Sequence, residues 1–499
     1  MNWTHTQFEL ASGHCRSGNL CRDCRGDLEF RKRLKKLGWV DNENFACPFG
    51  ATAENPIPVF PAEAPEVRRG GPGTELKKLI GWLGIHSAPG CKCNQRALAM
   101  DKQGADWCEE HLEEIVGWLR EEADRRGMPF HEFAGTQLVR LAIQRDQADR
   151  LKRIRAKQVP AKRGQKEIWV VGYPSTVGGA DTELDHQIDL WRRFDVQVNL
   201  VPLAPPSREM RRLCDERGCI THDYHPALFK DKVVVSFCNG DFLKRLPSIH
   251  RYRPRAVVWF NCMTWVFENE LKAVEAGLID YAGFVSNYQR GLLAPKLGVK
   301  ELPYVPYFNP DNRMQRLCQA APPAGSFCMG RISRADPCKF SNDMWSIFAD
   351  VRSPRPTKTF IAGWGIEVER RVGAAPSGLD WQIWEPGHRD ITPVSKFYSR
   401  LHCLIHKTGG SRESYCRAVV EAMASGVPVI VENDFAFPEL IDHGRTGFLC
   451  GSSEEMSAYA SQLAQDEGLR LTIAANARRH LFENLASPAK CWAGWKEIL

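Results

Sequence analysis

The sequence lacks the features that mark membrane-spanning and secreted chains. Nowhere in its 499 residues is there an apolar run of about 18 residues, the least that a transmembrane helix requires. The first residues, MNWTHTQFEL, lack the basic start and apolar stretch of a secretory signal. No segment repeats at a fixed period, which argues against a solenoid. We therefore expect a cytoplasmic protein (in the host cytoplasm if the chain is viral) with no membrane span.

A strong excess of charge of one sign is also lacking. The formal net charge is +7, from 67 basic and 60 acidic residues, so the composition permits a polyanionic partner without requiring one. Basic residues concentrate in one stretch, 152–166, which contains seven Lys or Arg and no acid. Both a solvated linker and a nucleic-acid contact fit this composition, and the linker is the simpler interpretation.

Cysteine, in contrast, is abundant: there are 18, and seven fall within the first 108 residues. In a reducing compartment, clustered cysteines indicate a metal more often than disulfides. A CxxC pair with a later Cys-Pro favours structural zinc on four thiolates, with buried free thiols or an iron–sulfur cluster as alternatives; the four are Cys15, Cys21, Cys24 and Cys47. A second group has only three thiolates, which His111 or His86 would complete, and buried thiols explain it equally well: Cys91, Cys93 and Cys108.

The chain divides into a cysteine-bearing N-terminal part and two consecutive series of strands and helices. We expect a zinc module at 1–50, a Pro/Gly-rich linker at 51–73 and a helical module at 74–160. Short apolar runs then alternate with helix-sized intervals over 166–315, and again over 325–485. This alternation predicts parallel sheets with crossover helices. The predicted fold class is therefore α/β, with two Rossmann-like lobes behind a small, metal-stapled, mainly helical module.

The segment 409–450 carries the strongest chemical signal. A Gly-Gly-Ser loop leads into a helix that we expect to begin near Glu413, and Glu421 follows a little over two turns later, on roughly the same face. Two such acids can hold sugar hydroxyls, while the free N–H groups of the helix start can hold a diphosphate. Considered alone, this spacing also fits an ordinary amphipathic helix with surface glutamates.

The surrounding sequence resembles the donor-binding region of family-4-type glycosyltransferases, which have the two-Rossmann-domain (GT-B) fold. Their pattern of Glu-x7-Glu, AMA-GVPV and Pro-Glu matches Glu413, Glu421, 422–429 and 438–439. The resemblance implies a UDP- or GDP-sugar donor. The transferred sugar of this donor would face Glu413, and its ribose would face Glu421. The resemblance also implies retention of anomeric configuration without an obligatory catalytic metal. The donor-binding set would further include Ser414 and Tyr415.

Two further segments extend the resemblance to roughly 166–485. In the first strand-to-helix turn, Gly178 and Gly179 let backbone amides approach the donor phosphate, because glycine has no side chain to block it. After the first strand of the second lobe, the family uses an Arg and a Lys to hold the diphosphate and offset charge on the departing nucleotide. The candidates are Arg331 and Lys339, with Arg334 as a competitor for the arginine role.

The chain departs from the family pattern in two places. Many relatives have a histidine after a strand of the first lobe, near the transferring sugar, and the matching strand ends here have none. Candidates for that place are His186, which as a lone histidine is more often structural, and Asn239, Asn261 and Thr264. Arg331 and Lys339 also lie further apart than in the family, which predicts a remodelled loop.

These features predict a retaining glycosyltransferase that uses a nucleotide sugar and recruits its acceptor partly through the N-terminal module. The zinc-like module and the basic stretch favour hydroxymethylated bases in DNA, as in phage-type modification enzymes. Protein, small-molecule and polysaccharide acceptors remain alternatives. The rival is a catalytically inactive GT-B protein that binds nucleic acid or serves as a scaffold; the missing histidine favours it, and the intact Glu413 and Glu421 oppose it. A third interpretation treats the N-terminal part as a piece that docks a partner.

Overall fold

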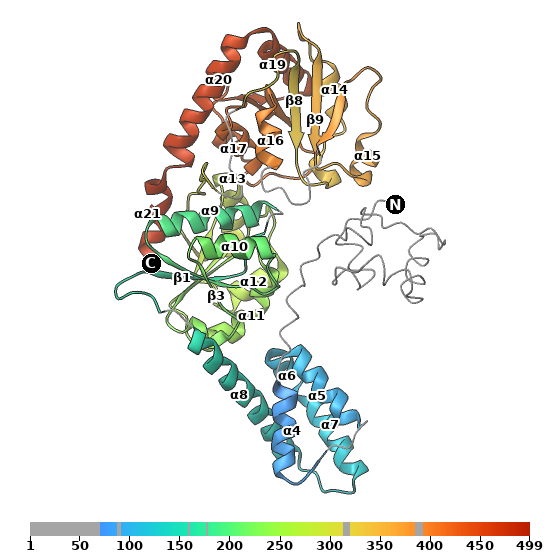
Figure 1. Cartoon of the computed structure of the whole chain (residues 1–499), viewed down its shortest axis with the longest axis vertical. Helices are drawn as coiled ribbons and strands as arrows, with labels where there is room; N and C mark the ends of the chain where they lie inside the picture. Colours follow the sequence, from blue (N-terminus) through green and yellow to red (C-terminus); the bar gives the residue numbers. More distant parts are fainter. Residues whose placement is uncertain (1–69, 87–90, 158–159, 176–177, 313–319, 385–392) are drawn as a thin grey trace, which may run out of the picture. The chain divides into compact units, whose positions relative to one another are not determined.

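The computed structural model describes residues 70–86, 91–157, 160–175, 178–312, 320–384 and 393–499 (Figure 1). The expected zinc module with Cys15, Cys21, Cys24 and Cys47, and the linker up to residue 69, lie outside these residues. The chain divides into a unit that ends at Asp149 and a second unit from Arg150 to Leu499. Within the ranges given above, no helix combines the length and the apolar character needed to cross a membrane.

The first unit contains a helical module. Its helices are α4 (Pro72–Trp82), α5 (Lys92–Gln103), α6 (Ala105–Glu110), α7 (Leu112–Arg125) and the first part of α8 (Glu132–Lys157). They share a core of apolar side chains, among them Leu76, Leu79, Ile115 and Val116. A Cβ on Gly73 would lie 2.0 Å from the carbonyl oxygen of Ala97. Helices α4 and α5 therefore pack this closely only because that position is glycine.

The N-lobe, as we call residues 167–301, is built on a seven-stranded parallel sheet of order β3-β2-β1-β4-β5-β6-β7. Its strands are β1 (Glu167–Val171), β2 (Gln197–Val201), β3 (Ile220–Thr221), β4 (Val233–Phe237), β5 (Ala256–Phe260), β6 (Tyr281–Gly283) and β7 (Lys300–Glu301). The crossover elements are α9 (Gly179–Arg193), α10 (Arg208–Glu216), η1 (Pro226–Phe229), α11 (Gly240–His250), α12 (Glu268–Glu275) and α13 (Asn287–Leu297). Every residue of β2, β4 and β5 is buried, as expected for strands that are covered on both faces.

The C-lobe follows with a six-stranded parallel sheet of order β10-β9-β8-β11-β12-β13. Its strands are β8 (Phe327–Ile332), β9 (Thr357–Ala362), β10 (Trp381–Trp384), β11 (Cys403–His406), β12 (Val429–Glu432) and β13 (Phe448–Cys450). Its helices are η2 (Pro337–Lys339), α14 (Met344–Ala349), α15 (Ile366–Val372), α16 (Pro393–Ser399), α17 (Arg417–Ala424), α18 (Phe437–Leu440), α19 (Ser453–Gln465) and α20 (Glu467–His480), followed by η3 (Leu481–Leu485). The two parallel sheets confirm the predicted α/β class with two Rossmann-like lobes.

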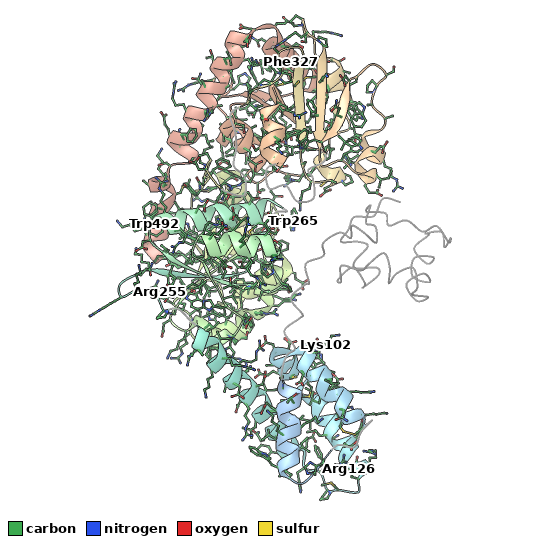
Figure 2. All side chains as sticks on the ribbon, in the orientation of Figure 1. Lys102, Arg126, Arg255, Trp265, Phe327 and Trp492 are labelled. Atoms are coloured by element: carbon green, nitrogen blue, oxygen red, sulfur yellow. A yellow bond between two sulfur atoms is a disulfide. The ribbon has the colours of Figure 1, made fainter. Side chains whose placement is uncertain are left out.

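The last helix, α21 (Pro488–Ile498), returns to the N-lobe, where Figures 1 and 2 show it beside α9. Trp495 donates from Nε1 to Oε1 of Gln187 on α9 at 2.9 Å, and Trp492 stacks on Phe194 with ring centroids 4.6 Å apart. The chain thus passes between the lobes twice, after β7 and before α21. Two connections restrict the relative motion of the lobes more than one flexible connection would.

Candidate functional site

The strand order of the C-lobe identifies where a ligand would bind. The chain runs from β8 outward to β9 and β10, and then returns to the other side of β8 to form β11. In open parallel sheets, ligands bind outside the carboxyl ends of the strands where the strand order reverses in this way. That point lies between β8 and β11. The loops that follow these two strands carry Lys339 and Glu413, and His406 is the last residue of β11.

Glu413 belongs to a loop, which corrects the expectation that it begins a helix. Helix α17 begins at Arg417, and the residue before it, Cys416, has φ 61° and ψ 77°. This left-handed conformation interrupts the helical path, because only φ near −60° continues a right-handed helix. Glu413 and Glu421 therefore do not share one helix face. Glu421 lies within α17, buried, and accepts a hydrogen bond of 3.0 Å from the hydroxyl of Tyr398.

The carboxylate of Glu413 lies in a buried ion pair. Lys339 donates from Nζ to Oε1 at 2.8 Å, and Nε2 of His406 lies 3.5 Å from the same oxygen. Burial alone would raise the pKa of Glu413, but the contact with His406 and the ammonium group of Lys339 lower it to about 2. Only 8% of Glu413 is exposed. The site therefore holds an ionised carboxylate that is largely shielded from water.

Arg331, expected to hold a diphosphate, has other partners in the structure. Its side chain is buried, and its guanidinium donates to the carbonyl oxygen of Ile332 at 2.6 Å and to that of Lys339. It also contacts Nδ1 of His406 at 2.8 Å. These bonds fix the loop that carries Lys339. Arg334 is exposed in the same loop and is thus the more accessible cation for a phosphate.

The glycine pair begins helix α9 as the sequence suggests. Gly178 has φ +105° at the N-cap, a conformation that glycine adopts without strain, and a Cβ on Gly179 would meet nothing within 4 Å. The start of this helix therefore has open space beside Gly179. Of the other candidates for donor binding, Ser414 donates from its hydroxyl to the carbonyl oxygen of Cys262 in the N-lobe at 2.9 Å. Tyr415 packs into the C-lobe core with 6% of its surface exposed, so neither side chain joins the carboxylate of Glu413.

Three of the four candidates for the absent histidine have structural partners. Nδ1 of His186 accepts from the backbone N–H of Asn309 at 2.7 Å, and its ring stacks on Phe308. Asn239 caps α11 by accepting from two backbone N–H groups. Asn261 donates to Glu270 at 2.6 Å and to the carbonyl oxygen of Trp265 at 2.9 Å. Thr264, in the loop after β5, is partly exposed.

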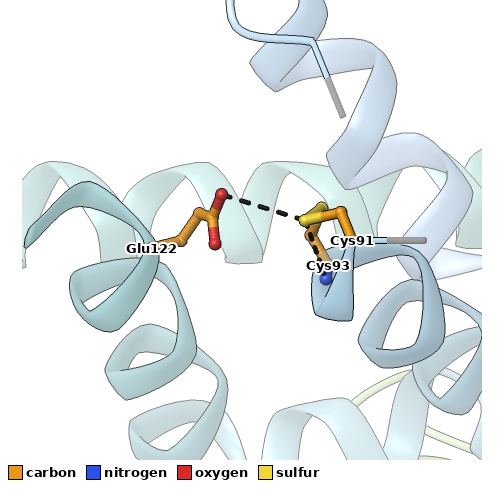
Figure 3. A group of neighbouring side chains, drawn as sticks. All are labelled: Cys91, Cys93 and Glu122. Atoms are coloured by element: carbon orange, nitrogen blue, oxygen red, sulfur yellow. Dashed lines mark hydrogen bonds between the residues drawn. A yellow bond between two sulfur atoms is a disulfide. The ribbon is translucent and has the colours of Figure 1, made fainter. Parts of the chain in front are cut away.

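The structure does not assemble the second cysteine group as a four-ligand set. Cys91 and Cys93 form a disulfide, and Oε1 of Glu122 lies 3.9 Å from the sulfur of Cys91 (Figure 3). Cys108 lies in the helical core, where burial raises its pKa to about 12. His111 bonds through Nδ1 to the carbonyl of Trp107 and stacks on that ring. Among the residues described in this unit, Cys91, Cys93 and Glu122 lie close enough to surround a metal ion, but in the disulfide neither sulfur is a thiolate that could bind one.

Three residues near the site were not singled out from the sequence. His406 ends an apolar strand, Cys416 occupies the left-handed position, and Arg417 on α17 donates to Glu183 of the N-lobe at 2.8 Å. Glu439 of the Pro-Glu pair accepts from two backbone N–H groups at the start of α13, at 2.6 and 2.7 Å. A polar residue at the end of a buried strand is the one sequence signal that would have identified His406.

Sequence comparison with known proteins finds matches in the C-lobe. Residues 356–480 match the family model "Glycosyl transferases group 1". The chain is 38% identical over 78 residues to an N-acetyl-alpha-D-glucosaminyl L-malate synthase of Bacillus anthracis. It is 28% identical over 142 residues to a GDP-mannose-dependent alpha-mannosyltransferase of Mycobacterium tuberculosis. These matches cover 15% and 28% of this chain, and 20% and 35% of the length of the two relatives.

Solved structures are similar over both lobes. HepE of Anabaena in complex with UDP-glucose has 16% sequence identity and a TM-score of 0.51, over 66% of this chain and 99% of that chain. TarM of S. aureus in complex with UDP has 11% identity and a TM-score of 0.50, over 67% and 99% of the two chains. At these identities the likeness establishes the fold: two parallel-sheet Rossmann-like domains, arranged as in GT-B glycosyltransferases.

Proposed function

We propose that this protein is a retaining glycosyltransferase that takes its sugar from a nucleotide-sugar donor. The observation that carries the proposal is the ionised, buried carboxylate of Glu413 beside Lys339, at the point where the strand order of the C-lobe reverses. A fixed charge in such a water-poor site acts strongly on a reacting sugar. The family match over 356–480 and the UDP-bound structural relatives support the same donor class.

In this proposal each group acts on the charge that develops during transfer. The bond between the anomeric carbon and the diphosphate oxygen breaks, and its electron pair leaves with the nucleoside diphosphate. The acceptor hydroxyl oxygen bonds to the anomeric carbon and releases its proton to the departing phosphate. Lys339 and Arg334 offset the charge of the diphosphate, together with the backbone at the start of α9. Glu413 faces the sugar and Glu421 the ribose.

A donor screen tests this function directly. The full chain would be incubated with a panel of UDP- and GDP-sugars, and release of nucleoside diphosphate would be measured beside the Glu413→Gln variant. Glutamine keeps the size of the side chain but removes the charge, so we expect release to fall by about 10²-fold or more. Release that persists in Glu413→Gln would reject the role of the carboxylate. No release from any donor would favour the inactive GT-B alternative.

For the acceptor, we propose a hydroxymethylated base in DNA, held through the basic stretch and not through the N-lobe edge. The described loops after β1, β4 and β5, at 172–175, 238–239 and 261–267, contain no Lys or Arg. Phosphate contacts normally come from such cations. Exposed cations do occur in the basic stretch: Lys152, Arg153, Arg155, Lys162 and Arg163.

The N-lobe edge instead presents one exposed aromatic side chain. Trp265, labelled in Figure 2, is 55% exposed in the loop after β5. An exposed aromatic ring can stack equally well on a nucleobase or on the apolar face of a sugar.

Changing the five exposed cations of the basic stretch to Gln should abolish the DNA-dependent release of nucleoside diphosphate while leaving release with small acceptors intact. Transfer to a neutral saccharide, with no effect of DNA, would replace this acceptor proposal.

A further inference from the structure

His406 is a buried histidine that the proposed roles of the site residues leave unused. It is the last residue of β11, and 2% of its surface is exposed. Four side chains surround its ring: Arg331 contacts Nδ1, Glu413 and Cys416 approach Nε2, and the ring of Phe437 lies 5.5 Å away with its plane inclined at 66°. A titratable ring in such a position needs a specific arrangement of hydrogen bonds.

Arg331 decides which ring nitrogen carries the proton. Its Nη1 lies 2.8 Å from Nδ1 of His406. A guanidinium has only N–H groups to offer, so Nδ1 has to accept this bond with its lone pair. If Nδ1 also carried a proton, its N–H group and that of Arg331 would point at each other across 2.8 Å. Burial and the charge of Arg331 also lower the pKa of His406 to about 4. The ring is therefore neutral near pH 7, and its single proton is on Nε2.

The Nε2–H group faces the carboxylate on which the proposed function depends. Nε2 lies 3.5 Å from Oε1 of Glu413, the oxygen that also accepts from Lys339 at 2.8 Å. Both donors approach Oε1, which leaves Oε2 to meet a bound hydroxyl. The contact is longer than an ordinary hydrogen bond, and such contacts in empty sites often shorten when substrate binds. Being neutral, the ring adds no charge that would cancel the carboxylate.

The same atoms could in principle hold a metal ion. One ligand atom from each of His406, Glu413 and Cys416 lies within 4.8 Å of the others, a donor set that zinc accepts. Two fixed cations oppose this, because Arg331 occupies Nδ1 of the ring and the ammonium group of Lys339 lies 2.8 Å from the carboxylate. Burial also raises the pKa of the Cys416 thiol, which disfavours the thiolate that a metal needs. The cluster is better suited to donating a hydrogen bond to the carboxylate than to binding a cation.

We propose that His406 is a positioning residue: Arg331 fixes its tautomer, and its Nε2–H group orients Glu413 against the donor sugar. This inference rests on the proposed glycosyl transfer and adds a step to it. The chain of contacts runs from Arg331 in β8 through His406 in β11 to Glu413 in the loop that follows. It explains why Arg331 at the end of β8 is buried among carbonyl oxygens while Arg334, in the loop that follows, is exposed.

Two substitutions separate the two contacts of the His406 ring, one with Arg331 and one with Glu413. In His406→Gln the amide nitrogen can take the place of Nε2 and still donate to Glu413. In His406→Asn the shorter side chain can accept from Arg331 at the place of Nδ1 but does not reach Glu413. We expect His406→Gln to retain kcat within about threefold, and His406→Asn to lose about 10- to 100-fold in kcat with little change in the KM for the donor. Equal losses in both variants, or no loss in either, would overturn the proposal.

A matched control comes from the same strand region. His402 is also buried, and its Nδ1 accepts from the backbone N–H of Cys328 at 2.9 Å, so His402→Asn and His402→Gln repeat the same chemistry away from Glu413. We expect both control variants to keep kcat and differ only in stability. A loss of kcat in His402→Asn as large as in His406→Asn would mean that the effect is a general consequence of core damage.

A second measurement does not depend on finding the donor. Spectra of ¹⁵N-histidine-labelled full-length protein, with the His406 signals assigned by their loss in His406→Gln, report which ring nitrogen is protonated. We expect the Nε2–H tautomer and no titration of this ring between pH 6 and 8. A proton on Nδ1, or a titration within that range, would overturn the inference even if the enzyme is active. If instead no donor is turned over while the tautomer is as expected, the proposed glycosyl transfer is rejected. The hydrogen-bond arrangement of Arg331, His406 and Glu413 is then confirmed without a role in that reaction.

Discussion

The two lobes have the same architecture but use their buried polar residues differently. In the C-lobe, Lys339 and His406 approach one carboxylate, Glu413, at the carboxyl end of the sheet. In the N-lobe, Asn261 and Trp259 both donate to Glu270, at 2.6 and 2.7 Å, and thereby hold the loop after β5 and the start of α12. The first arrangement concentrates charge at the proposed reaction site, whereas the second provides hydrogen bonds for a loop and a helix start.

This difference separates residues that we propose act on a ligand from residues that stabilise the fold. A buried carboxylate beside a lysine keeps its charge available, whereas a carboxylate surrounded by neutral donors, such as Glu270, has its hydrogen-bonding capacity used within the protein. Burial raises the pKa of Glu270 despite those donors, while the pKa of Glu413 is lowered to about 2. The catalytic proposal therefore concerns the C-lobe edge.

The largest effect is expected where the lobes meet, at the ion pair of Glu183 and Arg417. Their side chains are 3% and 8% exposed and lie 2.8 Å apart. Arg417→Met would leave the buried carboxylate without its counter-charge, which should cost about 3–5 kcal/mol of unfolding free energy. Urea unfolding followed by tryptophan fluorescence measures it, and the double variant with Glu183→Gln should recover most of the loss. A cost below about 1 kcal/mol in the single variant would contradict a structural role for this pair.

The next effect tests whether charge in the C-lobe acts on the reaction. Lys339→Met removes the cation beside Glu413, and we expect kcat/KM for the donor to fall by about 10²-fold, equivalent to about 2.7 kcal/mol. Lys358→Met is the control in the same lobe, since Lys358 lies 3.9 Å from Asp380 in an exposed pair. Similar losses in the two variants would mean that the measurement reports general charge and not the site.

A pH series distinguishes the buried histidines of the C-lobe. Burial is the main cause that lowers the pKa of His402 and of His406 to about 4, from an ordinary 6.5. The unfolded chain therefore binds protons that the folded protein does not, so stability is complete above pH 6.5 and declines as the pH falls toward 4. At pH 5 each histidine should account for about 2 kcal/mol of lost stability. His406→Gln should reduce the loss between pH 7 and pH 5 by that amount, and an unchanged loss would refute it.

The smallest effect is expected for the N-lobe cap. Asn239→Ala removes the side chain that accepts from the N–H groups of Asp241 and Phe242 at 3.1 Å, and should cost about 1 kcal/mol of stability. We expect kcat/KM to change less than about threefold, since the amide is engaged with the helix start. A tenfold loss of activity with unchanged stability would return Asn239 to the candidates for the absent histidine.

The sequence was sufficient for the long central strands and insufficient for the edges. Strands such as β4 (VVVSF) and β5 (AVVWF) are runs of apolar residues that only a doubly covered sheet can bury, and they were predicted. Strands β3 and β7 have two residues each and β10 four, with partly exposed side chains, so they produce no periodic signal. The return of α21 to the N-lobe was also unpredicted, because it depends on contacts such as Trp495 with Gln187, 308 residues apart.

The sequence by itself determined the scaffold and the identity of the key charges. The spacing of strands and helices predicted two parallel sheets, and the resemblance to family-4-type glycosyltransferases singled out Lys339, Glu413 and Glu421. Tertiary structure alone decided the state of those charges. Lys339 and Glu413 are 74 positions apart, and Arg331 and His406 are 75. A tautomer or a pKa depends on which groups lie within a few ångströms, and that distance is set when separate strands pack side by side.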